Sequence, residues 1–549
     1  MQKQLITVFF CFTLLFSLLS MRIYALTEDD RLVQAAQNQS RYTLTVQESR
    51  GQIYDCHLRP LVNRKEVFQG IVYPVAEGSG GLVDFLVREA DSPGGVSREG
   101  ILQQMESGRP FAIRLKHPSK AFPGLDVYQT YERYQDRQTA AHVIGYTNAD
   151  GQGVTGIEAA YDDLLKRQTV SSQLAFTVDA TGRYIKGVEA EPLGQTEATG
   201  GVVLTLDSRI QDICERAGAQ YIESGAIVVL DAKTSAIRAM ASFPSYSPNA
   251  LEESIADTQT APMINRALYA FSPGSIFKIV TTAAALEAGI PADFSYTCTG
   301  SVDIDGVVFH CHYRDGHGTL SMKEAFTVSC NPYFIVLAEK IGKEKLLQTA
   351  SDMGLGKSIF LADGIVGAAG SLPSADALPN PGDLANISFG QGLLTMTPLQ
   401  AAQMTACIVQ GGKTQTPWLV EGTTEDGIQV DAAERPPAPV AAIHPETAAQ
   451  IRAFMVSALE DQANQEGLPT VTTAGAKTGT AQTGRYNENG EEINQAWIVG
   501  FFPAENPEYV AAVLCEGGES GNLSAGPVFR EIADSVMRGQ ETQPSEGDA

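Results

Sequence analysis

Two residues three positions apart, Ser275 and Lys278, have the types and spacing for nucleophilic catalysis. They lie in FSPGSIFKIV, residues 271–280, which holds the only Ser-x-x-Lys of the chain. Positions i and i+3 of a helix share one face, so the lysine amine can reach the serine hydroxyl, which is a poor nucleophile without a base. The apolar residues around Lys278 predict a buried amine with a lowered pKa. A surface serine and lysine at the start of a core helix would show the same pattern.

A second pair, Ser329 and Asn331, forms a Ser-x-Asn pattern in the letters SCN. A capping-box pattern opens one helix at Ser321, and Asn331 followed by Pro332 is typical of a cap and first-turn proline that open the next helix. The pair is therefore expected on the turn between two helices. The pattern is weak by itself, because two other segments also match it, residues 247–249 and 520–522.

A third motif, Lys-Thr-Gly-Thr at Lys477, Thr478, Gly479 and Thr480, contains the only Lys-Thr-Gly of the chain. It precedes the apolar run AWIVGFF, which predicts a strand. A lysine and a hydroxyl can bind a carboxylate, and a glycine lets a ligand's backbone come close. The motif therefore suits an extended, anionic ligand.

Ser-x-x-Lys, Ser-x-Asn and Lys-Thr-Gly in this order are the signature set of penicillin-binding proteins and β-lactamases. From about residue 45 to residue 537 the chain resembles the class B penicillin-binding proteins, which are monofunctional peptidoglycan D,D-transpeptidases. RGQIYD, AHVIGYTNADGQGVTGIEAAYDDLL, NRALYAFSPGSIFK and ISFGQGLLTMTPLQAAQMTA are among the segments that carry the likeness. The likeness departs at Cys56, His57 and Leu58, where the family usually has Arg-Asn-Gly.

The resemblance implies a serine acyl-enzyme cycle without metal or cofactor. Ser275 would attack the bond between two D-alanines of a stem peptide, and Lys278 would accept its proton. Ser329 would pass a proton to the leaving amine, and Asn331 would position Lys278 and contact the substrate amide. An amine from another peptidoglycan strand would then attack the acyl-enzyme, and β-lactams would acylate the same serine.

The Lys-Thr-Gly strand would hold the other end of the substrate. The resemblance gives Lys477 the role of a positive charge and gives Thr478 and Thr480 contacts with the terminal carboxylate. The backbone N–H groups of Ser275 and Thr480 would form the oxyanion hole.

The expected fold class is α/β (α+β): a transpeptidase domain with a central antiparallel sheet flanked by helices, an elongated pedestal domain and an anchor. Residues 225–231 and the segment after AKTS predict a hairpin, and AWIVGFFP and EYVAAVLCEG predict neighbouring antiparallel strands. The expected divisions are an anchor at 1–26, a pedestal at 40–175, a linker at 176–200, the transpeptidase domain at 201–537 and a disordered tail at 538–549.

The first residues predict export. Residues 5–21 carry no charge, which favours a single membrane anchor over a signal peptide cleaved near Ala25, and either would place the rest outside the cytoplasm. A net charge of −25 argues against nucleic-acid binding. The resemblance also implies a membrane glycosyltransferase as partner.

Other motifs support different sites less well. His310, Cys311, His312 and His317, with Cys298 nearby, could form a zinc site, but a polar loop with a Cys298–Cys311 disulfide is the favoured interpretation. GQGVTG lacks the strand that a dinucleotide site needs, and no Gly-x-Ser-x-Gly occurs.

Two alternative functions remain. A D,D-carboxypeptidase or β-lactamase would let water release the acyl group, but such enzymes do not usually carry a pedestal of this size. A β-lactam sensor or an inactive scaffold would be expected to have several membrane spans or a lost catalytic residue, and this sequence shows neither.

Overall fold

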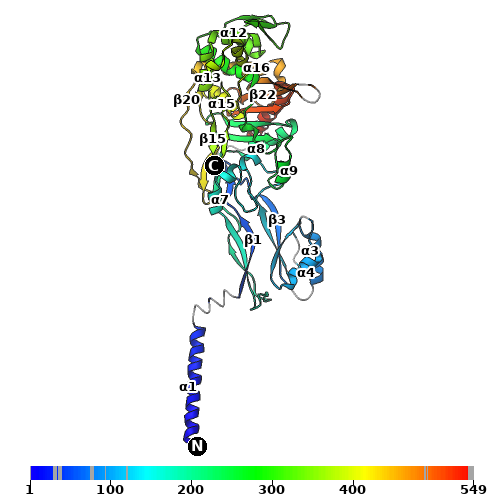
Figure 1. Ribbon diagram of the computed structural model, residues 1–549, viewed down its shortest axis with the longest axis vertical. Helices are drawn as coiled ribbons and strands as arrows, with labels where there is room; N and C mark the ends of the chain where they lie inside the picture. The colour runs from blue at the N-terminus through cyan, green and yellow to red at the C-terminus, as the bar shows by residue number, and fades with distance from the viewer. Residues whose placement is uncertain are drawn as a thin grey trace. The chain divides into compact units, whose positions relative to one another are not determined.

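The chain forms two compact units in the computed structural model, which describes residues 2–28, 34, 40–74, 79–92, 94–118, 122–486, 490 and 492–541 (Figure 1). The first unit comprises residues 1–50, 63–133 and 169–198, and the second comprises residues 51–62, 134–168 and 199–549. The expected boundaries at 175 and 201 differ from this division because the chain passes from one unit to the other several times.

The first unit begins with helix α1 (Gln2–Thr27), whose 26 residues bury no side chain. Its mean hydropathy of 2.0 makes it long and apolar enough to cross a membrane. At about 1.5 Å per residue, a helix of this length exceeds the roughly 30 Å hydrocarbon core of a bilayer.

Beyond α1, the described residues of the first unit include two three-stranded sheets and the helices α3 and α4. The sheet orders are β1-β6-β7 and β4-β3-β5. Helices α3 and α4 lie beside the second sheet and share an apolar cluster with it (Figure 1). Residues 176–200, expected as a linker, include β7, which pairs with β6. The bounds are β1 (Arg41–Ser49), β3 (Lys65–Val72), α3 (Ser79–Glu89), α4 (Arg98–Glu106), β4 (Phe111–Leu115), β5 (Leu125–Glu132), β6 (Val170–Thr177) and β7 (Glu191–Gly194).

The second unit is built on a five-stranded antiparallel sheet of order β10-β9-β23-β22-β21. The predicted central antiparallel sheet, the hairpin and the two C-terminal strands are confirmed. Strand β21, which carries the Lys-Thr-Gly motif, lies at an edge, where one side of its backbone has no neighbouring strand of the sheet. The bounds are β9 (Gly225–Asp231), β10 (Ile237–Phe243), β21 (Gly475–Tyr486), β22 (Glu492–Phe502) and β23 (Tyr509–Glu516).

Helices cover both faces of this sheet because successive strand residues point to opposite sides. Ile227 and Val229 of β9 pack with α8 (Ser208–Tyr221) and α17 (Gly526–Glu541). Val228 and Leu230 belong to the larger cluster on the other face. That cluster includes α10 (Lys278–Glu287), α11 (Met322–Thr327), α12 (Asn331–Ile341), α15 (Pro398–Val409) and α16 (Pro445–Glu460).

The second unit contains further short elements around this core. Strands β2 (Gln52–Tyr54), β8 (Gly201–Leu204), β18 (Val420–Thr424) and β19 (Asp431–Ala432) form a second sheet. The others are α5 (Ala141–Ile144), α6 (Gly156–Ala160), α7 (Asp162–Arg167), α9 (Leu251–Ala256), η1 (Arg266–Leu268), η2 (Gly274–Phe277), β11 (Tyr296–Cys298), β12 (Ser301–Ile304), β13 (Val307–His310), β14 (Gly318–Leu320), α13 (Lys343–Asp352), β15 (Ile359–Ala362), β16 (Ile365–Gly367), η3 (Ala375–Ala377), α14 (Pro381–Ser388), β17 (Lys413–Thr414), β20 (Val440–Ala441), η4 (Gln462–Gly467) and η5 (Gly521–Ala525). Of the expected tail, residues 538–541 belong to α17, and the rest lies outside the described residues.

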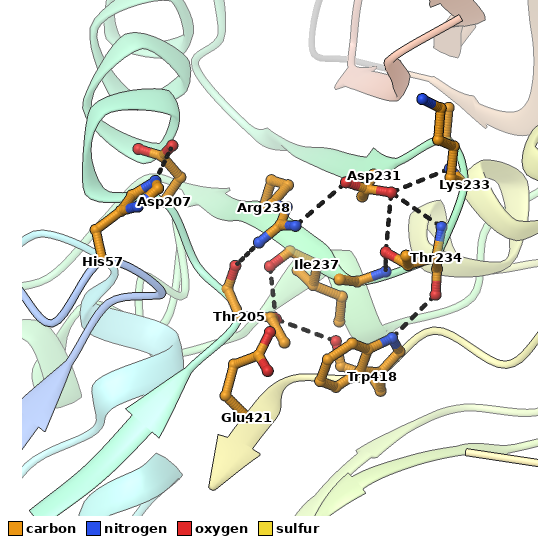
Figure 2. Close-up of polar contacts among 12 residues, drawn as sticks. His57, Thr205, Asp207, Asp231, Lys233, Thr234, Ile237, Arg238, Trp418 and Glu421 are labelled. Carbon is orange, nitrogen blue, oxygen red and sulfur yellow. Dashed lines mark hydrogen bonds and ion pairs between the residues drawn. The ribbon is translucent and has the colours of Figure 1, made fainter. Parts of the chain in front are cut away.

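A polar network fixes the turn between β9 and β10 (Figure 2). Asp231 accepts hydrogen bonds from the Lys233 and Thr234 N–H groups and from the Thr234 hydroxyl, at 2.9–3.0 Å. Arg238 donates to Asp231 Oδ2 and to the Thr205 carbonyl, each at 3.2 Å. Trp418 Nε1 donates to the Thr234 carbonyl at 3.0 Å. The network thus joins the central hairpin to Thr205, just after β8, and to Trp418, just before β18.

We expect the substitution Asp231→Ala to destabilise the second unit. It removes the acceptor of three turn hydrogen bonds and leaves Arg238 without its carboxylate, which costs about 1–3 kcal/mol in the free energy of unfolding. Thermal unfolding of the full chain in detergent measures the effect. Lys233→Ala is the matched control, because only the backbone N–H of that exposed residue takes part. Equal melting temperatures for the two variants would contradict this role.

Candidate active site

A cleft of about 940 Å³ in the second unit brings the three sequence motifs together. Ser275, Ser329, Asn331 and the motif residues 478–480 line it. Among the described lining residues there is no aspartate or glutamate, although the chain carries a net charge of −25. The lining is therefore suited to an anionic ligand.

Ser275 lies in a tight turn at the start of the buried helix. The i, i+3 spacing of Ser275 and Lys278 indicates a single helix, but residues 274–277 form the 3₁₀ turn η2, and α10 begins at Lys278. Gly274 adopts φ +56°, and its N–H donates to the Gly390 carbonyl at 2.9 Å. A Cβ on Gly274 would lie only 2.6 Å from the Thr480 carbonyl oxygen. The close approach of Thr480 explains why this turn needs a glycine.

Lys278 is fully buried and makes three hydrogen bonds. Its Nζ lies 2.7 Å from the Ser329 carbonyl, 3.0 Å from Ser329 Oγ and 2.6 Å from Asn331 Oδ1. Within the described residues, these are the hydrogen-bond partners of the amine, and Ser275 Oγ is not among them. Burial, aided by the positive charge of Lys477, lowers the pKa of Lys278 well below its usual range. The amine is therefore able to act as a neutral base.

Ser329 lies on the turn between α11 and α12, as predicted, whereas Asn331 already belongs to α12. Ser321 and Glu324 form the expected capping box of α11, and Ser329 follows that helix with a left-handed φ of +54°. The expectation that Asn331 caps the next helix is wrong by one position, because Cys330 is the cap of α12. Asn331 is the first helical residue, and its side-chain oxygen accepts the Lys278 hydrogen bond.

Lys477 brings a second buried amine to the same serine hydroxyl. It is 2% exposed, and its Nζ lies 3.2 Å from Ser329 Oγ and 2.9 Å from the Thr478 carbonyl. Burial lowers the pKa of Lys477 to about 7. The Ser329 hydroxyl thus lies between two lysine amines, one from α10 and one from β21.

The remaining motif residues form the wall of the cleft along β21. Thr478 Oγ1 donates to Asn464 Oδ1 at 3.2 Å, and Thr480 Oγ1 accepts from the Gly521 N–H at 3.3 Å. A Cβ on Gly479 would lie 3.0 Å from the backbone nitrogen of Ile276. The glycine therefore lets the edge strand lie against the turn that carries Ser275.

Several cleft residues could not be found from the motifs. Asn464, which lines the cleft, contacts Thr478. Trp497 is buried and does not line the cleft, but it fixes the loop before Ser275 through a 2.9 Å hydrogen bond from Nε1 to the Ser272 carbonyl. These residues lie in segments without a catalytic pattern, so only their proximity in the fold reveals them. The other lining residues with side-chain amides are Asn386, Gln391, Gln482, Asn494 and Asn522, of which Asn522 belongs to the Ser-x-Asn match at 520–522.

The cysteines near the cleft are all thiols. Cys298 and Cys311 are buried and unbonded, so the favoured disulfide is absent from this part of the structure. Of the suggested zinc ligands, His310 and His312 are exposed, whereas His317 lies 3.4 Å from the Cys311 sulfur.

Comparison with known proteins agrees with the geometry. The family model of the penicillin-binding protein transpeptidase domain matches residues 225–534, more than half of the chain. Stage V sporulation protein D of Bacillus subtilis is 32% identical over 415 residues, which are 72% of this chain and 62% of that protein. Peptidoglycan D,D-transpeptidase PbpA of Mycobacterium tuberculosis is 30% identical over 378 residues, which are 63% of this chain and 74% of that protein.

Solved structures show the same fold. Penicillin-binding protein A from M. tuberculosis, in a ceftriaxone acyl-enzyme complex, aligns with a TM-score of 0.65 at 24% identity, over 90% of this chain and 99% of that chain. The expected mixed α and β fold with a transpeptidase domain is confirmed. With the family model and these relatives in agreement, the chain belongs to the penicillin-binding protein transpeptidases, as a class B penicillin-binding protein.

Proposed function

We propose that this chain is a peptidoglycan D,D-transpeptidase that cross-links stem peptides through an acyl-enzyme on Ser275. The observation that carries the proposal is the convergence of Lys278, Ser329 and Lys477 beside the cleft that Ser275 lines. Relatives named peptidoglycan D,D-transpeptidase support the reaction class.

The acylation step begins at Ser275. Its Oγ attacks the carbonyl carbon of the peptide bond that joins the two D-alanines, and the hydroxyl proton of Ser275 passes to neutral Lys278 Nζ. Rotation about the serine side chain brings Oγ toward the amine, since catalytic hydrogen bonds often form only with substrate bound. The backbone N–H groups of Ser275 and Thr480 stabilise the oxyanion, a contribution of about 10²–10³ in rate.

Ser329 completes the step by moving the proton to the leaving group. Its hydroxyl lies within 3.2 Å of both lysine amines, so it can receive a proton from Lys278 and donate one to the departing D-alanine nitrogen. Asn331 holds the Lys278 amine in place. An acceptor amine from another strand then attacks the ester carbonyl and restores the Ser275 hydroxyl.

The substrate carboxylate binds along β21. Lys477 contributes positive charge, Thr478 and Thr480 donate hydroxyl hydrogen bonds, and Gly479 allows the close approach of the backbone. A β-lactam presents a carboxylate and a reactive carbonyl at similar positions, so it acylates the same serine.

Helix α1 supports attachment to a membrane with the second unit outside the cytoplasm. Lys3 and the amino terminus precede the apolar run and Arg22 follows it, so the basic residues give only a small charge difference between the two ends. A transpeptidase acts on glycan strands made by another enzyme, so a membrane glycosyltransferase is the proposed partner. Membrane fractionation and in vivo cross-linking test these two assignments; a wild-type chain recovered from the soluble fraction would rule out the anchor.

Fluorescent penicillin should label the wild-type chain but not Ser275→Ala. Ser329→Ala should label on the order of 10²-fold more slowly, because its proton relay is lost. Ser247→Ala is the matched control, since Ser247 belongs to another Ser-x-Asn pattern and is not among the residues that line the cleft. Gel fluorescence after timed labelling measures the rates. Undiminished labelling of Ser275→Ala would show that another residue is the nucleophile.

The acylation rate should depend on pH with a maximum near neutrality. It should rise with pH as Lys278 loses its proton, and fall above about pH 7 as Lys477 loses its charge. The rate constant for penicillin acylation is measured at about ten pH values between about 4 and 10, and these values give the profile. In Lys477→Arg the guanidinium keeps its charge, so the alkaline decrease should disappear. The same decrease in wild type and Lys477→Arg would exclude Lys477 as its source.

Transpeptidation and carboxypeptidation differ in the group that releases the acyl-enzyme. Incubation of the full chain with a pentapeptide ending in D-Ala-D-Ala and an excess D-amino acid should yield mainly the exchanged peptide. Mass spectrometry separates this product from the hydrolysed tetrapeptide. Hydrolysis alone would favour a carboxypeptidase, and neither product despite penicillin labelling would favour a sensor or scaffold.

A further inference from the structure

Four side chains of residue types that can bind metals, Cys298, Cys311, His317 and Cys330, meet near the cleft. Their sulfur and imidazole nitrogen atoms all lie within 4.8 Å of one another. The Cys311 sulfur lies 3.4 Å from His317 Nδ1. Each of the three cysteines is at most 2% exposed, while His317 is half-buried.

The local backbone brings these residues together. Strand β11 pairs with β14, and this places Cys298 opposite Gly318, next to His317. The Cys311 N–H donates to the Gly300 carbonyl at 2.9 Å, so Cys311 lies just beyond the end of β11. Cys330 reaches the same point from the cap of α12. Segments up to 32 positions apart in sequence therefore present their side chains to one small volume.

We propose that these four residues form a tetrahedral Zn²⁺ site with three thiolates and one imidazole. Zinc favours such donors, with Zn–S near 2.3 Å and Zn–N near 2.0–2.1 Å. A tetrahedral site of these bond lengths has donor separations of about 3.6–3.8 Å, so the 3.4 Å approach of Cys311 and His317 needs little adjustment. Soft thiolate ligands exclude Mg²⁺ and Ca²⁺ as the preferred ions.

A disulfide accounts for the cluster less completely. Any bridge would use two of the three cysteines and leave a third thiol and a histidine beside it without a role. All three are thiols in the structure. A zinc ion uses every member of the cluster, and three thiolates with one neutral imidazole complete its coordination.

A second cluster, Cys56, His57 and Asp207, is a weaker candidate. It offers three donors, and the His57 side chain is 54% exposed. Asp207 already caps α8 by accepting from the Arg209 and Ile210 N–H groups, and Figure 2 shows it facing His57. Its carboxylate thus has a structural role without a metal.

The proposed zinc site would hold the catalytic loop. Cys330 lies between Ser329 and Asn331, the two residues that contact the Lys278 amine. A metal–sulfur bond at Cys330 would fix the backbone of both neighbours. This consequence depends on the proposed function, whereas zinc binding itself does not.

The metal content of the purified full chain tests the site directly. Elemental analysis of protein prepared under reducing conditions should give about one zinc per chain in the wild type. Cys330→Ser, Cys311→Ser and His317→Gln should retain at least fivefold less. Cys214→Ala and Cys407→Ala, which remove buried thiols elsewhere, should keep the metal. Reconstitution with Co²⁺ should give visible absorption of tetrahedral thiolate coordination, and His317→Gln should weaken it.

Three results would overturn the proposal. The first is that the wild-type protein takes up neither Zn²⁺ nor Co²⁺. The second is that all three ligand variants retain zinc. The third is that the intact mass shows a native disulfide between two of these cysteines. If a cysteine variant fails to fold, uptake of Co²⁺ by the wild type and its loss in His317→Gln still decide the matter.

Chelation should also slow penicillin acylation on the order of 10- to 100-fold, since small displacements of catalytic groups have such effects. Added Zn²⁺ should restore the rate. Zinc binding without this rate effect would leave the site in place but remove its link to catalysis, and absent acylation in zinc-loaded protein would instead contradict the proposed function.

Discussion

The burial of two lysine amines around one serine hydroxyl is the constraint on which this active site depends. A charged amine loses its hydration on burial, so the fold favours the neutral form of Lys278 and brings the pKa of Lys477 to about 7. The positive charge of Lys477 further lowers the pKa of Lys278. Without this burial Lys278 would stay protonated, and the Ser329 hydroxyl would have no basic neighbour to exchange a proton with.

The rest of the second unit holds these three side chains in place. Lys278 opens a helix buried in the core, Lys477 lies on an edge strand, and Ser329 follows a helix in a left-handed conformation. Gly274 and Gly479 allow close backbone contacts, so the turn that carries Ser275 packs against β21. Because the strand is at an edge, one side of it can pair with an extended peptide while the other is held by β22.

Much of this arrangement follows from local patterns in the sequence. The capping box at Ser321, the β9–β10 hairpin and the C-terminal strand pair are encoded by neighbouring residues, and the structure contains all three. The 3₁₀ turn at Ser275 could not be predicted this way, because it depends on contacts with Thr480 and Gly390. Asn464 was missed for the same reason. The cap of α12 moved from Asn331 to Cys330 because Lys278 uses the asparagine side chain.

Cys330 shows how one position can serve both stability and chemistry. By sequence pattern it is the variable middle residue of Ser-x-Asn, and nothing nearby in sequence marks it as a ligand. In the fold it is fully buried, it occupies the N-cap position of α12 without a side-chain capping hydrogen bond, and its sulfur lies near two other thiols and an imidazole. A residue with neighbours of this kind cannot be exchanged freely for another small one. If the cluster binds a metal, coordination of Cys330 fixes the loop that carries Ser329 and Asn331, while the side chains of these two residues remain directed at Lys278.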